Sequence, residues 1–497
     1  MELINGFVYL FSDEMAIAFV LLGAVVGIVI GAMPGLTTAA VIAMLVPLTY
    51  YMQPLHALVF LYVIGKAGRF GGSIAAILFN TPGTAAAAAT VIDGNAMARR
   101  GMPGKALKTA SVSSVIGDFM GDALLIFGVV WISSITEKMG PPEYFAVFMM
   151  AFLIISSVVG SSVTRGIVST AAGIIISMIG IDPIEGMPRL DFGLLDFQSG
   201  MALVPLLLGM FVISEIALQL ENNLRFKGKA MAAAPLVQGG DKLSWSEVRR
   251  CLPLIFKSSA IGAVIGILPG IGSSVAAFAA YGEGKRRSKT PEKWGTGIVE
   301  GIAAPESANN AVSGPTMIPL LALGIPGSTI AAILLGVFLI HGIMVGPQIF
   351  VTSGDLVYAL FAAGLIGIVL YGLIGYFASG YIGRILAKIP TRLIYPYILL
   401  ISFISAYSVR SNIFDIYVMC AAGLFGYLMR KGGFSTAAFV IAFILAKSAE
   451  EAFRQSLLMS NDGWLIFFDR PVVMALLAIG LLTVAGRLWS ARKTAVL

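Results

Sequence analysis

The chain alternates long apolar stretches with short polar segments. Stretches such as 144–160, 200–220, 355–383 and 471–486 carry almost no charge. They reach or approach the roughly 20 residues that a helix needs to cross the hydrocarbon of a bilayer. This pattern predicts an all-α polytopic membrane protein with about 10–12 transmembrane segments.

Composition supports a membrane protein and excludes an ordinary soluble one. Of 497 residues, 58% are hydrophobic and 12% are charged, whereas soluble chains carry roughly one quarter charged residues. The first residues, MELINGFVYLFSDEM, contain no Lys or Arg and no small-residue cleavage pattern. We therefore expect the first helix to be retained rather than removed as a signal peptide.

Charge and cysteine usage argue against two other kinds of site. The formal net charge is +7, but the basic residues lie in short loops between apolar stretches. We interpret them as a topological signal rather than a nucleic-acid surface. Cys251 and Cys420 have no C-x-x-C spacing, and His56 and His341 are isolated. The sequence therefore predicts no transition-metal site, no disulfide framework and no cofactor.

An internal repeat divides the chain into two halves. GIVIGAMPGLTTAAVIAML at 27–45 matches GAVIGILPGIGSSVAAFAAY at 262–281, and ILFNTPGTAAAA at 77–88 matches LALGIPGSTIAA at 321–332. The order of the matches is kept along the chain, as a duplication would give. We expect a first repeat at 1–220, a polar cytoplasmic linker at 221–250 and a second repeat at 251–497.

The basic loops indicate that the two halves have opposite orientations. The loop at 99–108 has four basic residues and its counterpart at 343–352 has none. The segment at 285–293 has five, and its counterpart at 50–58 has none. Basic loops are preferentially cytoplasmic, so the sequence predicts two inverted-topology repeats, with the N-terminus outside and the C-terminus cytoplasmic.

Four Pro-Gly pairs interrupt the apolar stretches at equivalent places in the two halves. Proline removes an amide donor and glycine permits positive φ, so each pair can end one helix and let another begin. We expect discontinuous helices or re-entrant hairpins whose N-terminal ends favour an anion and whose carbonyl ends favour a cation. The pairs are Pro34-Gly35, Pro82-Gly83, Pro269-Gly270 and Pro326-Gly327.

Three of these segments carry a family resemblance. GAMPGLTTAAVIAMLVPLTY (31–50), FGGSIAAILFNTPGTAAAAATVIDG (70–94) and GIVEGIAAPESANNAVSGPTMIPLLALGIPGS (297–328) resemble the large membrane subunit of the tripartite tricarboxylate transporters, and the resemblance extends over essentially the whole chain. One departure is Phe70, where the family usually has Tyr before Gly-Gly-Ser.

The resemblance implies an ion-coupled importer of carboxylates in a bacterial inner membrane, which makes the outer side periplasmic. It also implies two partners, a small membrane subunit and a periplasmic solute-binding protein. The substrate is expected to be a tricarboxylate such as citrate or a related carboxylate, and the sequence leaves dicarboxylates and aromatic acids open.

We expect the carboxylate to bind where the helix breaks meet near the middle of the membrane. The candidate substrate-binding residues are Arg69, Ser73, Asn80, Thr81, Pro82, Gly83, Thr84, Ser274, Asn310, Pro326, Gly327, Ser328 and Thr329. The candidate residues for the coupling ion, Na⁺ or H⁺, are Gly35, Asn80, Gly270, Asn309 and Asn310. Buried asparagine is costly without partners, which favours a function for the three asparagines.

Several ionisable residues fall within apolar segments, where they are candidates for function. Lys66 and Arg69 lie three apart and suit an anion, an interface or an acidic partner. Asp118 and Asp122 lie four apart and suit Na⁺ binding, a proton relay or, as the sequence favours, the start of a helix near the interface. Glu306 follows a proline and is expected to begin a helix.

Two other function classes remain as alternatives. An intramembrane aspartyl protease is suggested by Asp118 and Asp122, but catalytic aspartates converge from separate elements and these lie one turn apart on one helix. An anion channel would need no coupling ion. The sequence has no G-x-x-x-x-G-K-[ST] phosphate loop, so we expect a non-enzymatic transporter driven by an ion gradient rather than by ATP.

Overall fold

The computed structural model describes residues 2–33, 36–136, 138–158, 162–182, 185–225, 242–346, 348–386 and 391–496. These residues form helices and their connections, together with one pair of two-residue antiparallel strands, β1 (Gly180–Ile181) and β2 (Pro188–Arg189). The prediction of an all-α polytopic membrane protein is confirmed. The first break, Pro34-Gly35, and residues 226–241 of the linker lie outside the described residues.

The helices follow one another in the same order in the two halves. Those of the first half are α1 (Glu2–Phe11), α2 (Glu14–Gly31), α3 (Thr38–Leu45), η1 (Val46–Tyr51), α4 (Pro54–Phe79), α5 (Ala87–Arg99), α6 (Pro103–Thr136), α7 (Pro141–Val158), α8 (Val163–Ser177), α9 (Leu195–Gln198), α10 (Leu203–Leu207), η2 (Leu208–Ile213) and α11 (Ser214–Arg225). Those of the second half are α12 (Trp245–Ile267), α13 (Gly272–Arg287), η3 (Pro291–Lys293), α14 (Val299–Ala311), α15 (Met317–Leu323), α16 (Thr329–Ile340), α17 (Ile349–Thr352), α18 (Gly354–Leu386), α19 (Thr391–Arg410), α20 (Ile413–Lys431), α21 (Thr436–Met459), η4 (Gly463–Phe467) and α22 (Pro471–Val496).

Within the described residues, eight helical segments are long and apolar enough to cross a membrane, and five more apolar helices are shorter. The shorter ones include α3 and α16, which follow the first and fourth Pro-Gly breaks. A break that splits a helix leaves pieces too short to span hydrocarbon alone. The discontinuous helices expected from the sequence are therefore present, and the inverted relation of the two halves stays a prediction.

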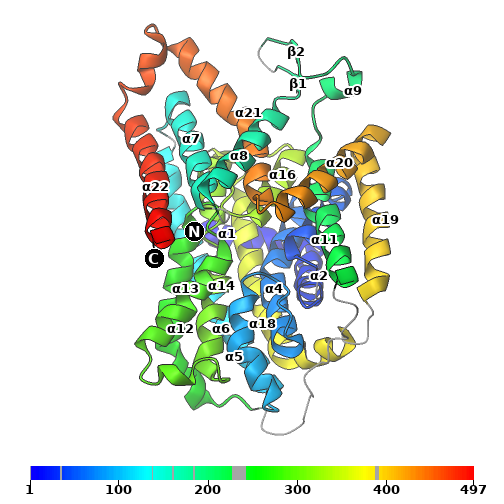
Figure 1. Cartoon of the computed structure of the whole chain (residues 1–497), viewed down its shortest axis with the longest axis vertical. Helices are drawn as coiled ribbons and strands as arrows, with labels where there is room; N and C mark the ends of the chain where they lie inside the picture. Colours follow the sequence, from blue (N-terminus) through cyan, green and yellow to red (C-terminus); the bar gives the residue numbers. More distant parts are fainter. Residues whose placement is uncertain are drawn as a thin grey trace.

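Helix α4 forms the centre of the molecule (Figure 1), and all its residues from Leu55 to Phe79 are buried. A helix that is apolar all round belongs in a protein interior, and α2, α5, α6 and α18 surround this one. Small residues let α2 approach closely: a Cβ added at Gly31 would lie 2.3 Å from the carbonyl oxygen of Gly68. Such contacts replace the hydrophobic driving force that lipid removes.

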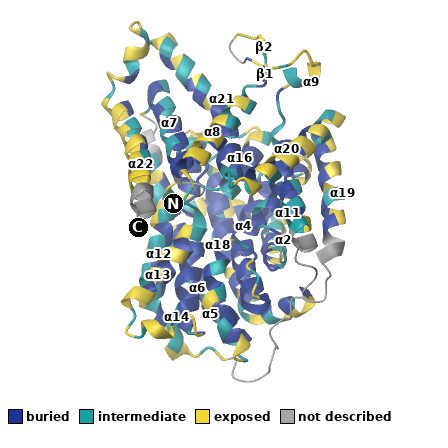
Figure 2. Ribbon diagram, viewed as in Figure 1, coloured by how far each residue is buried: buried dark blue, intermediate teal, exposed yellow. Residues whose placement is uncertain are grey.

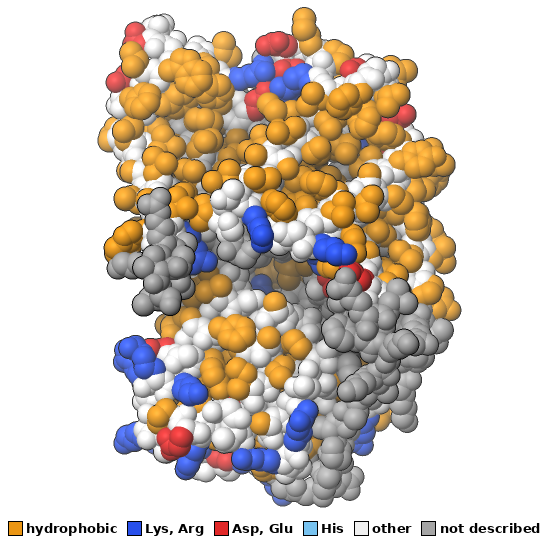
Figure 3. Space-filling model, in the orientation of Figure 1, with side chains coloured by type: hydrophobic (Ala, Val, Ile, Leu, Met, Phe, Trp, Pro, Cys, Tyr) orange, Lys and Arg blue, Asp and Glu red, His pale blue; other side chains and the backbone are white. Residues whose placement is uncertain are grey.

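The outer helices expose apolar side chains to their surroundings. Helix α22 is mostly exposed (Figure 2), and its exposed side chains include Leu481, Leu482 and Trp489. Hydrophobic side chains cover much of the visible face in Figure 3, whereas Lys and Arg side chains gather at its lower end near α5, α12 and α13. This distribution fits a surface in contact with lipid and an end in contact with water.

The buried carboxylate of Asp93 in α5 joins the two halves at this basic end. It accepts hydrogen bonds from the backbone amides of Gly295, Gly297 and Ile298 at 2.8–3.1 Å and from the Tyr281 hydroxyl at 2.8 Å. These partners follow the basic segment at 285–293, and Asp93 precedes the basic loop at 99–108. The two basic segments therefore adjoin.

Candidate functional site

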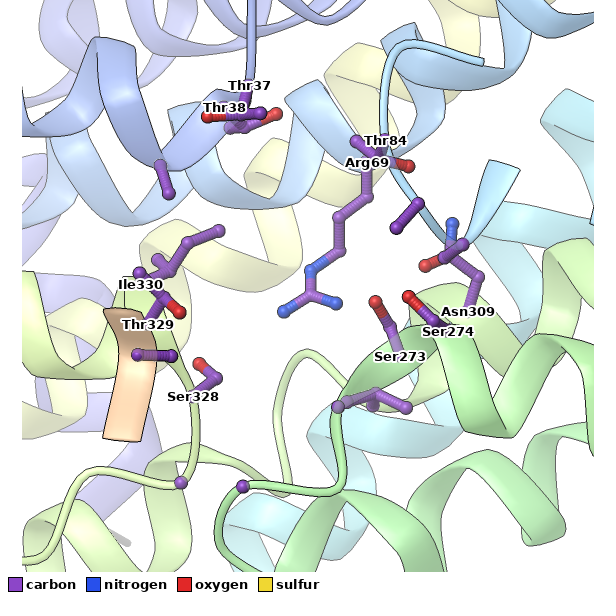
Figure 4. A pocket seen from close by; sticks show the side chains of 18 of the residues that line it. Thr37, Thr38, Arg69, Thr84, Ser273, Ser274, Asn309, Ser328, Thr329 and Ile330 are labelled. Carbon is purple, nitrogen blue, oxygen red and sulfur yellow. The ribbon is translucent and has the colours of Figure 1, made fainter. Parts of the chain in front are cut away.

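Four helices begin at one cavity of about 280 Å³. Its wall includes the first residues of α3, α5, α13 and α16 and the residues just before them. Each of these helices follows one of the four Pro-Gly pairs. The polar lining residues are Thr37, Thr38, Arg69, Thr84, Ser273, Ser274, Asn309, Ser328 and Thr329 (Figure 4).

Local chemistry explains why helices start here. The side chains of Thr37, Thr84 and Ser328 accept hydrogen bonds from the backbone amides of Ala40, Ala87 and Ala331, each at 3.2 Å. A capping hydroxyl satisfies one of the amides that a first turn leaves free, and the others stay available to a ligand. Each helix start also carries a partial positive charge. The cavity wall thus favours an anion.

Direct backbone contacts bring the breaks together in pairs. The amide of Gly270 donates to the carbonyl of Gly327 at 3.1 Å, which joins the third and fourth breaks. Gly270 has φ +84°, a conformation that glycine adopts without strain. In the first half, a Cβ at Gly83 would lie 2.2 Å from the carbonyl oxygen of Gly31, just before the first break. Glycine is therefore required for the chain to close around the cavity.

Arg69 supplies the one full positive charge in the lining. Its guanidinium extends from α4 into the cavity (Figure 4), while the side chain is only 8% exposed. Among the described residues, no carboxylate forms an ion pair with Arg69, and its buried Nε has no hydrogen-bond partner. A buried charge without a partner is costly. An anionic ligand in the cavity would provide the missing partner.

Two further buried polar groups beside the cavity lack partners in the described part of the chain. Both the amide nitrogen and the amide oxygen of Asn309 are unbonded, and so is the Thr38 hydroxyl oxygen. Buried polar side chains are rarely left in this state. Together with Arg69, they provide donors and acceptors for a polar ligand.

The cavity contains eight of the residues that sequence reasoning selected. Those on its wall are Arg69, Thr84, Ser274, Gly327, Ser328 and Thr329 among the substrate candidates, and Gly270 and Asn309 among the ion candidates. The candidates that do not line it are Ser73, Asn80, Thr81, Pro82, Gly83, Asn310 and Pro326. Gly35 lies outside the described residues. That any of them binds substrate or ion stays a prediction.

Some of the candidates away from the cavity have structural roles. Asn80 ends α4 in the left-handed conformation at φ 57° and is exposed, so the expectation that it is buried was wrong. Asparagine is one of the few residues that adopt this conformation readily, and Asn80 here acts as a helix C-cap. Thr81 donates its hydroxyl to the carbonyl of Phe79 at 2.9 Å.

The sequence analysis missed Thr37, Thr38 and Ser273. A signal was present, because every Pro-Gly pair is followed within four residues by hydroxyl side chains, in PGLTT, PGT, PGIGSS and PGST. A hydroxyl in that position caps a new helix and lies at its N-terminal end. The helix starts at all four breaks could therefore have been selected together.

Lys66, Asp118 and Asp122 form a buried ionic cluster beside the cavity. The Lys66 ammonium donates to one oxygen of Asp118 and to one of Asp122, each at 2.7 Å, and the Tyr371 hydroxyl donates to the other Asp118 oxygen at 3.1 Å. The two aspartates lie within α6, fully buried, so the expected position near an interface was wrong. Of the roles considered for Lys66, the structure supports pairing with acids.

Glu306 forms a second buried polar cluster. It lies inside α14 rather than at the start of a helix, which corrects the sequence expectation. Its carboxylate accepts hydrogen bonds from Ser73 at 2.6 Å, from Ser114 at 3.0 Å and from Thr90. Asn310 donates to the Ser114 hydroxyl oxygen at 2.9 Å. Ser73 and Asn310 thus hold this acid and its neighbours in place.

Comparisons with known proteins agree with these features. A sequence model described as the tripartite tricarboxylate transporter TctA family matches residues 17–441. The chain is 33% identical over 465 residues to an uncharacterized 52.8 kDa protein in the TAR-I ttuC' 3' region of Agrobacterium vitis, which covers 94% of this chain and 91% of that protein.

A second relative from Agrobacterium vitis, an uncharacterized protein in the TAR-II ttuC' 3' region, is 35% identical over 223 residues, covering 45% of this chain and 92% of that protein. No solved structure matches. The family match extends over most of the chain and includes all four helix breaks. The chain therefore belongs to the TctA family of tripartite tricarboxylate transporters and is a multi-pass membrane subunit of a transporter.

Proposed function

We propose that the chain forms the transport pathway of a binding-protein-dependent secondary transporter, which imports tricarboxylates or related carboxylates across a bacterial inner membrane. The observation that carries this proposal is the cavity at which four helix starts and the Arg69 guanidinium meet. Helix starts bind anions through free amides and partial charge, and a guanidinium binds a carboxylate with two parallel hydrogen bonds.

The size of the cavity supports a small substrate. Its volume of about 280 Å³ lies just below the roughly 300–1,000 Å³ typical of ligand sites. The lining has hydroxyls and an amide rather than aromatic rings. A compact molecule with several carboxylate groups fits this wall better than a large aromatic acid.

The partners and the energy source complete the proposal. The family description supports a three-component system, in which a periplasmic solute-binding protein delivers the carboxylate and a small membrane subunit accompanies this chain. Transport is driven by a gradient of Na⁺ or H⁺. The adjoining basic segments at 99–108 and 285–293 face the cytoplasm, which places the N-terminus in the periplasm and the C-terminus in the cytoplasm.

Uptake in proteoliposomes tests the proposal. The chain, the small subunit and the binding protein from the same source are combined, and labelled citrate, succinate, malate and benzoate are offered with an imposed Na⁺ gradient, an imposed pH gradient or neither. We expect gradient-dependent accumulation of a di- or tricarboxylate and counterflow without a gradient. Indifference of all uptake to both gradients, or single-channel currents without accumulation, would contradict a secondary transporter.

A further inference from the structure

A continuous buried hydrogen-bond network connects the two polar clusters behind the cavity. The Tyr371 hydroxyl lies within hydrogen-bond distance of the Asp118 carboxylate, at 3.1 Å, and of the Ser114 carbonyl, at 3.2 Å. The Ser114 hydroxyl donates to Glu306, and Lys66 joins Asp118 to Asp122. The network thus connects side chains of α4, α6, α14 and α18.

Asp122 is the incompletely bonded carboxylate of this network. Both oxygens of Asp118 accept hydrogen bonds, and Glu306 accepts three. Asp122 accepts one, from Lys66, and its Oδ2 is buried without a partner among the described residues. An ionised carboxylate with a bare buried oxygen is unfavourable. A bound positive charge would relieve this cost.

Glycines fix the space around Asp122. A Cβ at Gly314 would lie 2.6 Å from its Oδ1, and one at Gly364 would lie 3.1 Å from its Oδ2. The titratable groups that face it are Lys66 and Tyr62 from α4 and Asp118 from its own helix, while Tyr371 of α18 and Glu306 of α14 lie further along the network. The carboxylate is thus closely packed on all sides.

The charges of this region balance only while the cavity is empty. Lys66 and Arg69 provide two positive charges one turn apart on α4, and Asp118 and Asp122 provide two negative charges. An anion bound to Arg69 adds negative charge next to a region that water does not reach. Like charges in low dielectric repel strongly. One added positive charge on the cluster would restore the balance.

A proton fits this place better than a metal cation does. The Lys66 ammonium already lies between the two aspartates, 2.7 Å from an oxygen of each. Na⁺ would need several oxygen ligands at the same place and would be repelled by the ammonium. A proton needs no additional volume and binds directly to the bare oxygen.

We propose that Asp122 is the proton-binding group of the transporter, and that it takes up a proton on Oδ2 when a carboxylate occupies the cavity. The inference rests on the proposed function and identifies its coupling ion as H⁺. The proton comes from the outer aqueous phase with the substrate and leaves to the cytoplasm with it, so each cycle moves one proton through this group. Binding of the two ligands is mutually favourable, since such coupling is reciprocal.

The test compares gradient-driven uptake with exchange in the complete reconstituted transporter. Citrate, or whichever carboxylate of the panel the wild type takes up, is measured with and without an inside-alkaline pH gradient, and counterflow is measured without a gradient. We expect Asp122→Asn to lose the stimulation by the gradient and to retain counterflow, because exchange needs no net proton movement. Asp122→Glu, which keeps an acid, should retain part of the stimulation.

Asp415→Asn is the matched control. Asp415 is equally buried, pairs with Arg410 at 3.2 Å and has an oxygen without a partner among the described residues, but it lies in α20 away from the cluster. This variant should keep the stimulation by the pH gradient. Stimulation retained in Asp122→Asn, or counterflow lost together with it, would overturn the assignment.

A measurement on the wild type keeps the inference testable even when a variant does not insert. A pH-sensitive dye inside the vesicles should report acidification during uptake at a pH well above the carboxyl pKa values of the substrate. Uptake that is driven by Na⁺ and carries no protons would overturn the role of Asp122 and leave the proposed function intact. No carboxylate uptake under any gradient would instead refute the proposed function itself.

Discussion

Replacement of Arg69 by glutamine removes the single full charge that faces the cavity. The guanidinium extends into the cavity from the central helix α4, and no carboxylate pairs with it among the described residues. In Arg69→Gln the side chain remains polar and of similar reach, and its charge is lost. The substitution therefore tests the charge rather than the packing.

The expected loss follows from the kind of bond removed. A hydrogen bond to a charged group contributes about 1.5–3 kcal/mol, and 1.4 kcal/mol corresponds to a tenfold change in affinity. Arg69→Gln should therefore weaken carboxylate binding by about 10- to 100-fold. Arg69→Lys should lose less, because lysine keeps the charge but cannot form the two parallel bonds of a guanidinium.

Counterflow at graded carboxylate concentrations measures this loss, and thermal unfolding in detergent without substrate gives a second, independent readout. The unfolding temperature of Arg69→Gln should not fall, because the variant removes a buried charge that has no protein partner. Arg410→Gln is the control, since Arg410 pairs with Asp415 and does not line the cavity. An affinity of Arg69→Gln within twofold of the wild type would refute the role of Arg69 as an anion ligand.

Three other substitutions test the framework that holds the cavity, each by thermal unfolding in detergent and by counterflow. Gly83→Ala should lower stability by about 1–3 kcal/mol, because its Cβ would lie 2.2 Å from the carbonyl oxygen of Gly31, whereas Gly486→Ala, with no atom within 4 Å, should change little. Asp93→Ala should lower stability by about 3 kcal/mol or more, because it leaves three backbone amides and a tyrosine hydroxyl without their acceptor; unchanged unfolding would contradict its role as an anchor. Lys66→Met should cost about 3–5 kcal/mol by leaving two buried aspartates unpaired, and an added aspartate-to-asparagine change in the cluster should recover part of this loss.

The fold class and the helix breaks could be predicted because each depends on local chemistry. Spans follow from runs of apolar residues, and a break follows from a proline that lacks an amide next to a glycine that permits positive φ. The third break shows both features, since α12 ends before Pro269 and Gly270 has φ +84°. The duplication placed equivalent breaks in both halves, which indicated that they belong to one site.

The orientation of side chains around the breaks could not be predicted, because it depends on contacts between distant segments. Asn80 and Asn309 look equivalent in sequence, but one caps a helix in contact with solvent and the other is buried beside the cavity. Lys66 and Asp118 are 52 residues apart, and only the packing of α4 against α6 brings them together. A single sequence contains no record of that pairing.

The placement of Arg69 and Lys66 on one helix connects the charge of the substrate with the charge of the cluster. A helix start carries about half an elementary charge, so four starts and one guanidinium surround the cavity with roughly three positive charges. The cluster one turn away has a net charge of −1 while both aspartates are ionised, and this charge opposes that of Arg69. A proton on Asp122 removes the opposition. Because the repulsion grows with the charge of the bound anion, a tricarboxylate gains more from that proton than a monocarboxylate does, so the same arrangement favours multivalent substrates and couples them most tightly to the proton.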